Sequence, residues 1–156
     1  MKIHTSILHV NGEERQVTIQ SSDTLLYILR SQLGLTGAKP GCLNGDCGAC
    51  SINIDGWPMK SCLMLAVEAE GTDITTVEGL NNAPIQQAFI ENFAFQCGYC
   101  TPGFIMNCHA LIKQHPDADD ETIKKWLQSN ICRCTGYAEI EKAIKTVLRN
   151  EQETSG

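Results

Sequence analysis

The spacing of nine cysteines constrains this 156-residue chain more than any other feature. Eight of them form two sets of four. In the first set, Cys42, Cys47, Cys50 and Cys62 are separated by four, two and eleven residues. The second set consists of two close pairs, Cys97 with Cys100 and Cys132 with Cys134, with 31 residues between the pairs. Because an odd number of cysteines cannot pair completely as disulfides within one chain, we expect metal binding rather than a disulfide framework.

The first set has the C-x4-C-x2-C spacing and distant fourth cysteine that are typical of a plant-type [2Fe-2S] cluster. Its loop must curve tightly and direct backbone N–H groups at the sulfurs of an anionic cluster. We expect Gly41, Gly45 and Gly48 to permit that curvature by adopting positive φ angles. The alternative is a zinc ion bound by four cysteines, although such zinc sites usually place their ligands in two short pairs.

The spacing of the second set is compatible with either zinc or an iron–sulfur cluster. Thr-Pro-Gly follows Cys100 and Thr-Gly-Tyr follows Cys134. We therefore expect both pairs at helix N-termini, where free amides and the helix dipole stabilise an anionic cluster. The ninth cysteine, Cys108, lies on the apolar side of a predicted helix, so we expect a buried thiol there rather than a ligand.

The two halves of the chain have different periodicities. The first half predicts two hairpins, one last strand and a helix capped by Ser22 or Asp23. The hairpins span 3–20, around Asn11-Gly12, and 51–59, around Asp55-Gly56, and the last strand spans 74–77. The second half predicts four helices, at about 84–95, 101–114, 120–127 and 137–148. The fold class is therefore α+β, with a strand-rich domain at 1–78 followed by a helical domain at 79–156.

The composition excludes several classes of function. The chain has 12 basic and 18 acidic residues, and a net charge of −6 argues against nucleic-acid binding. No apolar run is long enough to span a membrane, and residues 1–16 do not resemble a secretory leader, so we expect a cytoplasmic protein. The sequence has no Ser/His/Asp constellation, phosphate-binding loop or dinucleotide fingerprint. We therefore expect a chain that handles electrons and has no catalytic residues of its own.

Four motifs in this order carry a resemblance to a known family: GCLNGDCGAC at 41–50, Ser61-Cys62, QCGYCTPG at 96–103 and CRCTGY at 132–137. Over about residues 3–148 the chain resembles the small iron–sulfur subunit of the molybdenum hydroxylases, the xanthine oxidase family. This resemblance implies a β-grasp ferredoxin-like domain followed by a four-helix-bundle domain, each with one [2Fe-2S] cluster. One departure is Leu43, where the family commonly has glycine or another small residue, and we expect an altered cluster surround there.

The resemblance also implies a function and partners. In such enzymes a large subunit holds molybdopterin and oxidises the substrate, which is a purine, carbon monoxide, an aldehyde, an N-heterocycle or an aromatic thioester. Electrons then pass through the helical-domain cluster and the ferredoxin-like cluster to FAD on a medium subunit, in a dimer of heterotrimers. The resemblance further implies that Gln96 and Cys134 lie beside the pterin. The alternatives are a free two-cluster ferredoxin and, in a different class, a zinc-stapled interaction module; an apolar exposed face around Gln96 and Cys134 would favour the subunit.

Overall fold

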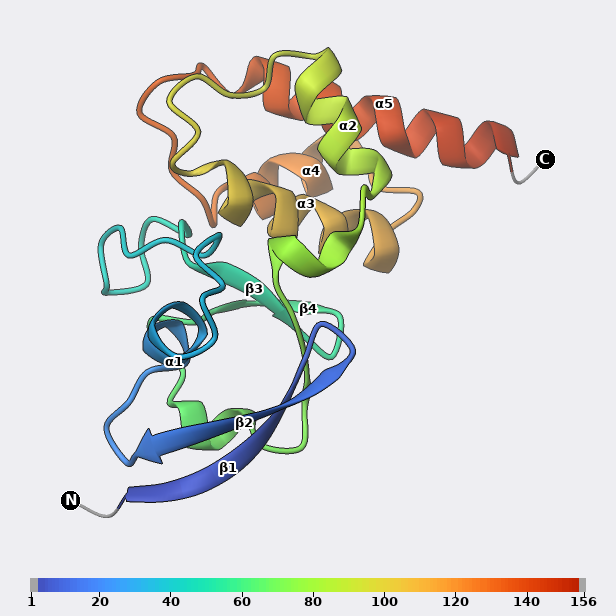
Figure 1. Cartoon of the computed structure of the whole chain (residues 1–156). Helices are drawn as coiled ribbons and strands as arrows, with labels where there is room; N and C mark the ends of the chain where they lie inside the picture. The colour runs from blue at the N-terminus through green and yellow to red at the C-terminus, as the bar shows by residue number, and fades with distance from the viewer. Residues whose placement is uncertain (1–2, 155–156) are drawn as a thin grey trace.

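The computed structural model describes residues 3–154 and shows a sheet domain beside a helical domain (Figure 1). The predicted α+β class is confirmed. Residues 1–2 and 155–156, the outer ends of the two predicted domains, lie outside the described part of the chain. Between residues 3 and 154, no helix is both long enough and apolar enough to cross a bilayer.

The N-terminal domain contains a five-stranded mixed sheet with the strand order β2-β1-β5-β3-β4. The strands are β1 (Ile3–Val10), β2 (Glu13–Gln20), β3 (Ser51–Ile54), β4 (Trp57–Lys60) and β5 (Asp73–Thr75). β1 and β5 are parallel, and the other neighbouring strands are antiparallel. Both predicted hairpins are confirmed, because Asn11, Asp55 and the glycines that follow them have the positive φ angles that these tight turns need. The last strand ends at Thr75 rather than at residue 77, where a short 3-10 helix, η2 (Val77–Leu80), begins.

Helix α1 (Leu25–Ser31) lies against this sheet and closes its core (Figure 1). The apolar side chains of α1 and of the strands form one buried cluster, which includes Leu8, Ile19, Leu25, Ile28, Leu29, Ile52 and Ile74. The predicted cap at Ser22 or Asp23 is wrong. Thr24 is the N-cap and accepts a hydrogen bond from Tyr27 N at 3.3 Å, whereas the Asp23 carboxylate accepts from Gln20 N at 2.8 Å. A second 3-10 helix, η1 (Ala66–Ala69), packs near α1 and was not predicted from the sequence.

The C-terminal domain contains four α-helices around a second buried apolar cluster. They are α2 (Pro84–Glu91), α3 (Thr101–Gln114), α4 (Asp120–Leu127) and α5 (Ala138–Thr154). The predicted ranges of α3 and α4 are confirmed. α2 ends earlier than expected because the chain turns at Phe93, which has a φ of +52°. α5 continues past residue 148 because the polar residues that follow contain no helix breaker.

The two domains pack against each other through α3 and β3. All four residues of β3 are buried, since the sheet core covers Ile52 and Ile54 while α3 packs on the same strand. Trp57 of β4 and Trp126 of α4 stack across the junction, with ring centroids 6.5 Å apart. This junction brings the loop before β3 close to the segment between α4 and α5.

Candidate metal centres

The loop at residues 41–50 directs backbone amides at its own cysteine sulfurs. Cys47 N and Asn44 N donate to Cys42 Sγ at 3.2 and 3.5 Å, and Cys42 N and Ala49 N donate to Cys47 Sγ at 3.3 and 3.5 Å. The amides of Cys47 and Asn44 lower the pKa of the exposed Cys42 thiol to about 6, with the amide of Cys47 as the largest cause. At Cys42 the loop therefore favours thiolate sulfur, the form that binds metals.

The glycines of this loop have two different roles. Gly45 and Gly48 have φ angles of +88° and +70°, as predicted. The expectation of a positive φ at Gly41 is wrong: Gly41 is needed because a Cβ there would lie 2.5 Å from Cys47 Sγ. Leu43 has a φ of +59°, so a branched side chain occupies the left-handed region, where glycine is usual.

Cys62, the distant member of the first set, lies beside Cys50. The Ser61 hydroxyl donates to Cys50 O at 2.7 Å and ties the segment after β4 to the end of the loop. Burial raises the pKa of Cys62 to about 11, with further contributions from a hydrogen bond and the charge of Cys50. The first set thus runs from exposed Cys42 to buried Cys50 and Cys62.

The second set meets at the start of α3. Cys100 is the N-cap of α3, and it lies in hydrogen-bonding contact with Cys132. Burial raises the pKa of Cys100 to about 12, followed by the hydrogen bond and charge of Cys132 and the charge of Cys97. Cys132 is held by Tyr137, whose hydroxyl accepts from Cys132 N at 3.0 Å, a role that the sequence did not indicate. The expectation of a helix N-terminus holds for the first pair only, because Thr135, Gly136 and Tyr137 separate Cys134 from α5.

Cysteines of both sets line one small cavity of about 220 Å³. Cys42 and Cys47 contribute from the first set, and all four cysteines of the second set contribute. Ile131 and Tyr99 close its apolar walls. The two candidate centres are therefore neighbours, although more than thirty residues separate the sets in sequence.

The donor sets fit a cluster of two irons. Six of the eight candidate ligand thiols meet in pairs, Cys42 with Cys47, Cys50 with Cys62 and Cys100 with Cys132, and a four-cysteine [2Fe-2S] cluster needs two thiolates on each iron. In addition, Thr101 Oγ1 is buried beside Cys100 with no partner among the described residues, so an acceptor such as a cluster sulfide would satisfy it.

Gln96 and Cys134 lie together on the surface of the helical domain. The Gln96 side-chain amide donates to Cys134 O at 3.0 Å. Cys108, in contrast, lies within the helical core with 1% of its surface exposed, and burial raises the pKa of its thiol. The prediction of a buried thiol at Cys108 is confirmed.

Comparisons with known proteins agree with this geometry. Residues 9–95 match the family model described as a 2Fe-2S iron-sulfur cluster binding domain, and residues 76–145 match the model described as a [2Fe-2S] binding domain. The nicotinate dehydrogenase small FeS subunit of Eubacterium barkeri is 44% identical over 88% of this chain and 90% of its own length. The caffeine dehydrogenase subunit gamma of Pseudomonas sp. (strain CBB1) is 46% identical over 94% of this chain and 92% of its own length.

Among solved structures, a chain of quinoline 2-oxidoreductase from Pseudomonas putida 86 superimposes with a TM-score of 0.92 at 38% identity. The match covers 100% of this chain and 99% of that chain. The likeness therefore extends over both domains and over both cysteine sets. This chain belongs to the family of small [2Fe-2S] iron–sulfur subunits of the molybdenum hydroxylases.

Proposed function

We propose that this chain relays electrons from a molybdopterin centre on a large subunit to FAD on a medium subunit, by way of two [2Fe-2S] clusters. Cys42, Cys47, Cys50 and Cys62 would hold one cluster. Cys97, Cys100, Cys132 and Cys134 would hold the other. Each bound cluster supplies a one-electron redox centre. The observation that carries the proposal is the single cavity lined by cysteines of both sets.

The chain's own residues provide the environment for this chemistry. The amides of Cys42, Asn44, Cys47 and Ala49 direct hydrogen bonds at sulfur, which stabilises negative charge on the first centre. Burial of Cys50, Cys62 and Cys132 keeps water away from the inner side of each site. These are the factors by which a protein adjusts the potential of a cysteine-bound cluster.

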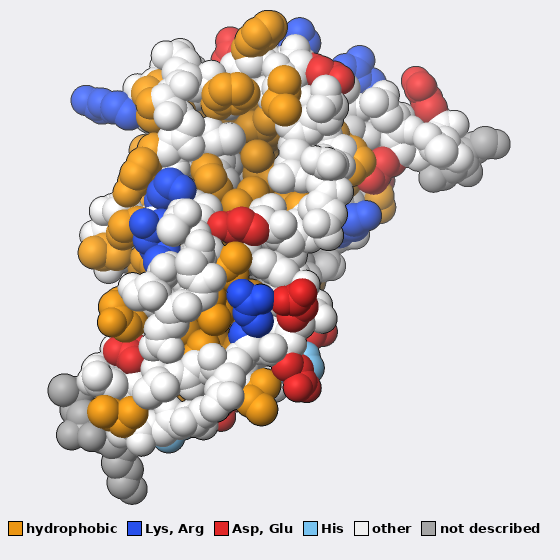
Figure 2. Space-filling view, viewed as in Figure 1, with side chains coloured by type: hydrophobic (Ala, Val, Ile, Leu, Met, Phe, Trp, Pro, Cys, Tyr) orange, Lys and Arg blue, Asp and Glu red, His pale blue; other side chains and the backbone are white. Residues whose placement is uncertain are grey.

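Exposed apolar side chains around the second site favour a subunit over a free ferredoxin. Gln96 and Cys134 are both exposed, and residues 92–101 contain no charged side chain. Large apolar residues on the segments that lead into the second site are exposed, namely Ile90, Phe93, Phe95, Tyr99 and Ile131, with Phe93 at 80%. Figure 2 shows hydrophobic side chains along the left of the view, with Lys and Arg side chains among them, beside the cysteine-bearing segments of Figure 1. We propose that the molybdopterin subunit covers this face, with Gln96 and Cys134 beside the pterin.

Two further exposed apolar residues lie beside the first site. Leu43 and Leu63 are 59% and 60% exposed, and they flank Cys42 and Cys62 in sequence. We propose that the FAD-bearing subunit docks here, so that each site faces a different partner. The proposed assembly is a dimer of such heterotrimers in the cytoplasm, where the eight ligand thiols stay reduced. The proposed domains are 1–78 and 79–156.

The substrate of the complex is oxidised on the large subunit. The relatives described above are named for nicotinate, caffeine and quinoline, which are all N-heterocycles. We therefore propose an N-heterocycle as the substrate class for the complex that contains this chain.

Purification of the chain with its co-expressed partners tests the proposal. We expect a coloured complex with two irons and two sulfides for each cysteine set, and two distinct cluster signals in low-temperature EPR of the reduced complex. A colourless protein that binds zinc without iron would overturn the cluster assignment and support an interaction module. A chain that loads both clusters but binds neither partner would overturn the subunit assignment and support a free ferredoxin.

A further inference from the structure

A buried asparagine connects the two cysteine loops. Asn130 lies two residues before Cys132, and 3% of its surface is exposed. Its Nδ2 donates to Gly48 O at 3.0 Å, between Cys47 and Cys50, and its Oδ1 accepts from Ser129 Oγ at 2.8 Å. One side chain therefore joins the segment that carries Cys132 to the loop that carries the first set.

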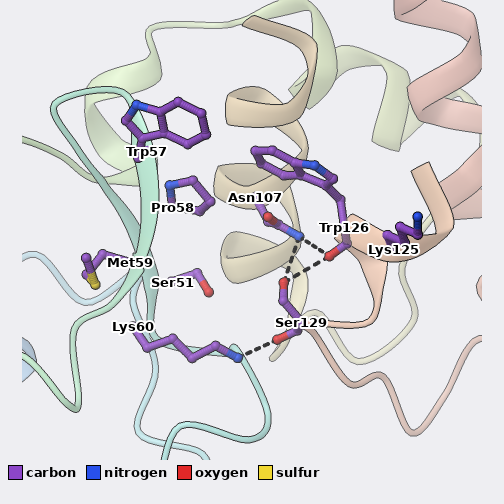
Figure 3. Close-up of a pocket in the computed structure, with 9 residues that line it drawn as sticks. All are labelled: Ser51, Trp57, Pro58, Met59, Lys60, Asn107, Lys125, Trp126 and Ser129. Carbon is purple, nitrogen blue, oxygen red and sulfur yellow. Dashed lines mark hydrogen bonds between the residues drawn. The ribbon is translucent and has the colours of Figure 1, made fainter. Parts of the chain in front are cut away.

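The segment around Asn130 is itself held from both domains, as Figure 3 shows. Asn107 of α3 is buried, and its Nδ2 donates to Trp126 O at 2.8 Å and to Ser129 Oγ at 2.9 Å. Lys60 of β4 donates from Nζ to Ser129 O at 2.6 Å. The Ser129 hydroxyl, which accepts from Asn107, also lies 3.0 Å from Trp126 O and 2.8 Å from Asn130 Oδ1, so its one hydrogen is shared between these two acceptors. A polar network anchored by buried Asn107 and Asn130 favours one arrangement of the chain over its alternatives.

Two further hydrogen bonds join the cysteine loops. Ile131 N donates to Cys47 O at 2.9 Å, so one residue and one hydrogen bond separate Cys132 from Cys47. The Tyr99 hydroxyl donates to Pro40 O at 3.0 Å, between the segment of Cys97 and Cys100 and the start of the first loop. Each cysteine loop is thus attached to the other at several points.

We propose that Asn130 is a positioning residue that fixes the distance and orientation between the two cysteine sets, and hence the magnetic and electronic coupling of the clusters they hold. The inference rests on the proposed function for its clusters, but the contacts belong to the chain alone. Asparagine suits the position because it offers a donor to Gly48 O and an acceptor to Ser129 in one short side chain. An aspartate has the same shape but would place a carboxylate oxygen against the Gly48 carbonyl.

The test compares Asn130→Asp with a matched control, Asn92→Asp. Asn92 also donates from Nδ2 to a main-chain carbonyl, Ala88 O at 2.8 Å, but that carbonyl belongs to its own helix. In the full chain loaded with both clusters and reduced by dithionite, we expect Asn130→Asp to keep both EPR signals but change the magnetic splitting between them. The control is expected to leave the splitting unchanged. An unchanged splitting in loaded Asn130→Asp would overturn the proposal.

Hydrogen exchange gives a second readout that does not need the clusters. We expect the Ile131 amide, which bonds to Cys47 O, to exchange about tenfold faster in Asn130→Asp and in the uncharged variant Asn130→Ala than in the unsubstituted chain. If Asn130→Asp does not fold, Asn130→Ala carries both measurements. An unchanged exchange rate of the Ile131 amide in a folded variant would overturn the proposal. A wild-type chain that binds no iron would overturn the proposed function, but the hydrogen-exchange measurement would still test the role of Asn130.

Discussion

Gly103, in the first turn of α3, allows the helix to approach the first cysteine loop closely. A Cβ at this position would overlap Gly48 O and lie 3.1 Å from Ala49 Cα. Both are main-chain atoms, so a change of rotamer cannot relieve the overlap. In an unobstructed helix, Gly→Ala stabilises by about 1 kcal/mol. Overpacking against a rigid neighbour costs about 1–3 kcal/mol, and the overlap with backbone here argues for the upper end.

We therefore expect Gly103→Ala to lower the free energy of unfolding by about 2 kcal/mol, the difference between a loss of about 3 and a gain of about 1 kcal/mol. For a chain of this size, that loss corresponds to a thermal midpoint about 4–8 °C lower. Far-UV circular dichroism of the cluster-loaded chain measures the midpoint. Gly136→Ala is the control, because a Cβ there meets no atom within 4 Å, and we expect it to be neutral or stabilising by about 0.4–1 kcal/mol. A Gly103→Ala midpoint equal to or above that of the control would refute the reasoning.

Three further predictions follow from the site and its surroundings. Cys100→Ser is expected to remove the EPR signal of the second site and keep that of the first, because Cys100 and Cys132 pack in the helical core whereas Cys50 and Cys62 pack in the sheet core. Cys108→Ala should keep both signals, and simultaneous loss of both signals in Cys100→Ser would contradict the assignment. Phe93→Asp should change the chain's own stability by less than about 0.5 kcal/mol but weaken binding of the molybdopterin subunit about tenfold or more in a titration, and unchanged affinity would argue against that interface. Hydrogen bonds from Thr122 hold the pKa of Asp119 below its ordinary value, so the unfolded chain takes up this proton more readily and the stabilisation is lost as the pH falls through the folded pKa. Asp119→Asn should therefore flatten the fall of the thermal midpoint below about pH 4, and an unchanged slope would exclude this contribution.

Local chemistry made most of the elements predictable. Asn11-Gly12 and Asp55-Gly56 specify tight turns through their own φ preferences, so both hairpins followed from a few residues. The end of α2 could not be predicted in this way, because nothing near Phe93 in the sequence forbids another helical turn. The left-handed conformation of Phe93 directs the chain from α2 toward Cys97, which is a requirement of the tertiary fold.

The candidate site also has features that the sequence predicts and features that only the fold reveals. Spacing alone selects eight cysteines as ligands, which remains a prediction, but spacing says nothing about which thiols meet or how closely the two sets approach. The pairing of Cys100 with Cys132 and the contact of Asn130 with Gly48 both join residues that are far apart in sequence. The sole sequence signal for Asn130 is its place two residues before Cys132. The sequence pointed to Gly41, but on the expectation of a positive φ angle, which Gly41 does not have. Glycine is needed there because a Cβ would lie too close to Cys47 Sγ, and that closeness arises only in the folded loop.

The burial of Cys108 has a practical consequence. With 1% of its surface exposed and the pKa of its thiol raised, Cys108 is neither accessible nor ionised while the helical core is closed. An alkylating reagent can modify it only during openings of that core, so the rate of modification reports how often such openings occur. The rate at which Cys108 is alkylated, measured by mass spectrometry, therefore reports the transient opening of the helical domain without any introduced probe.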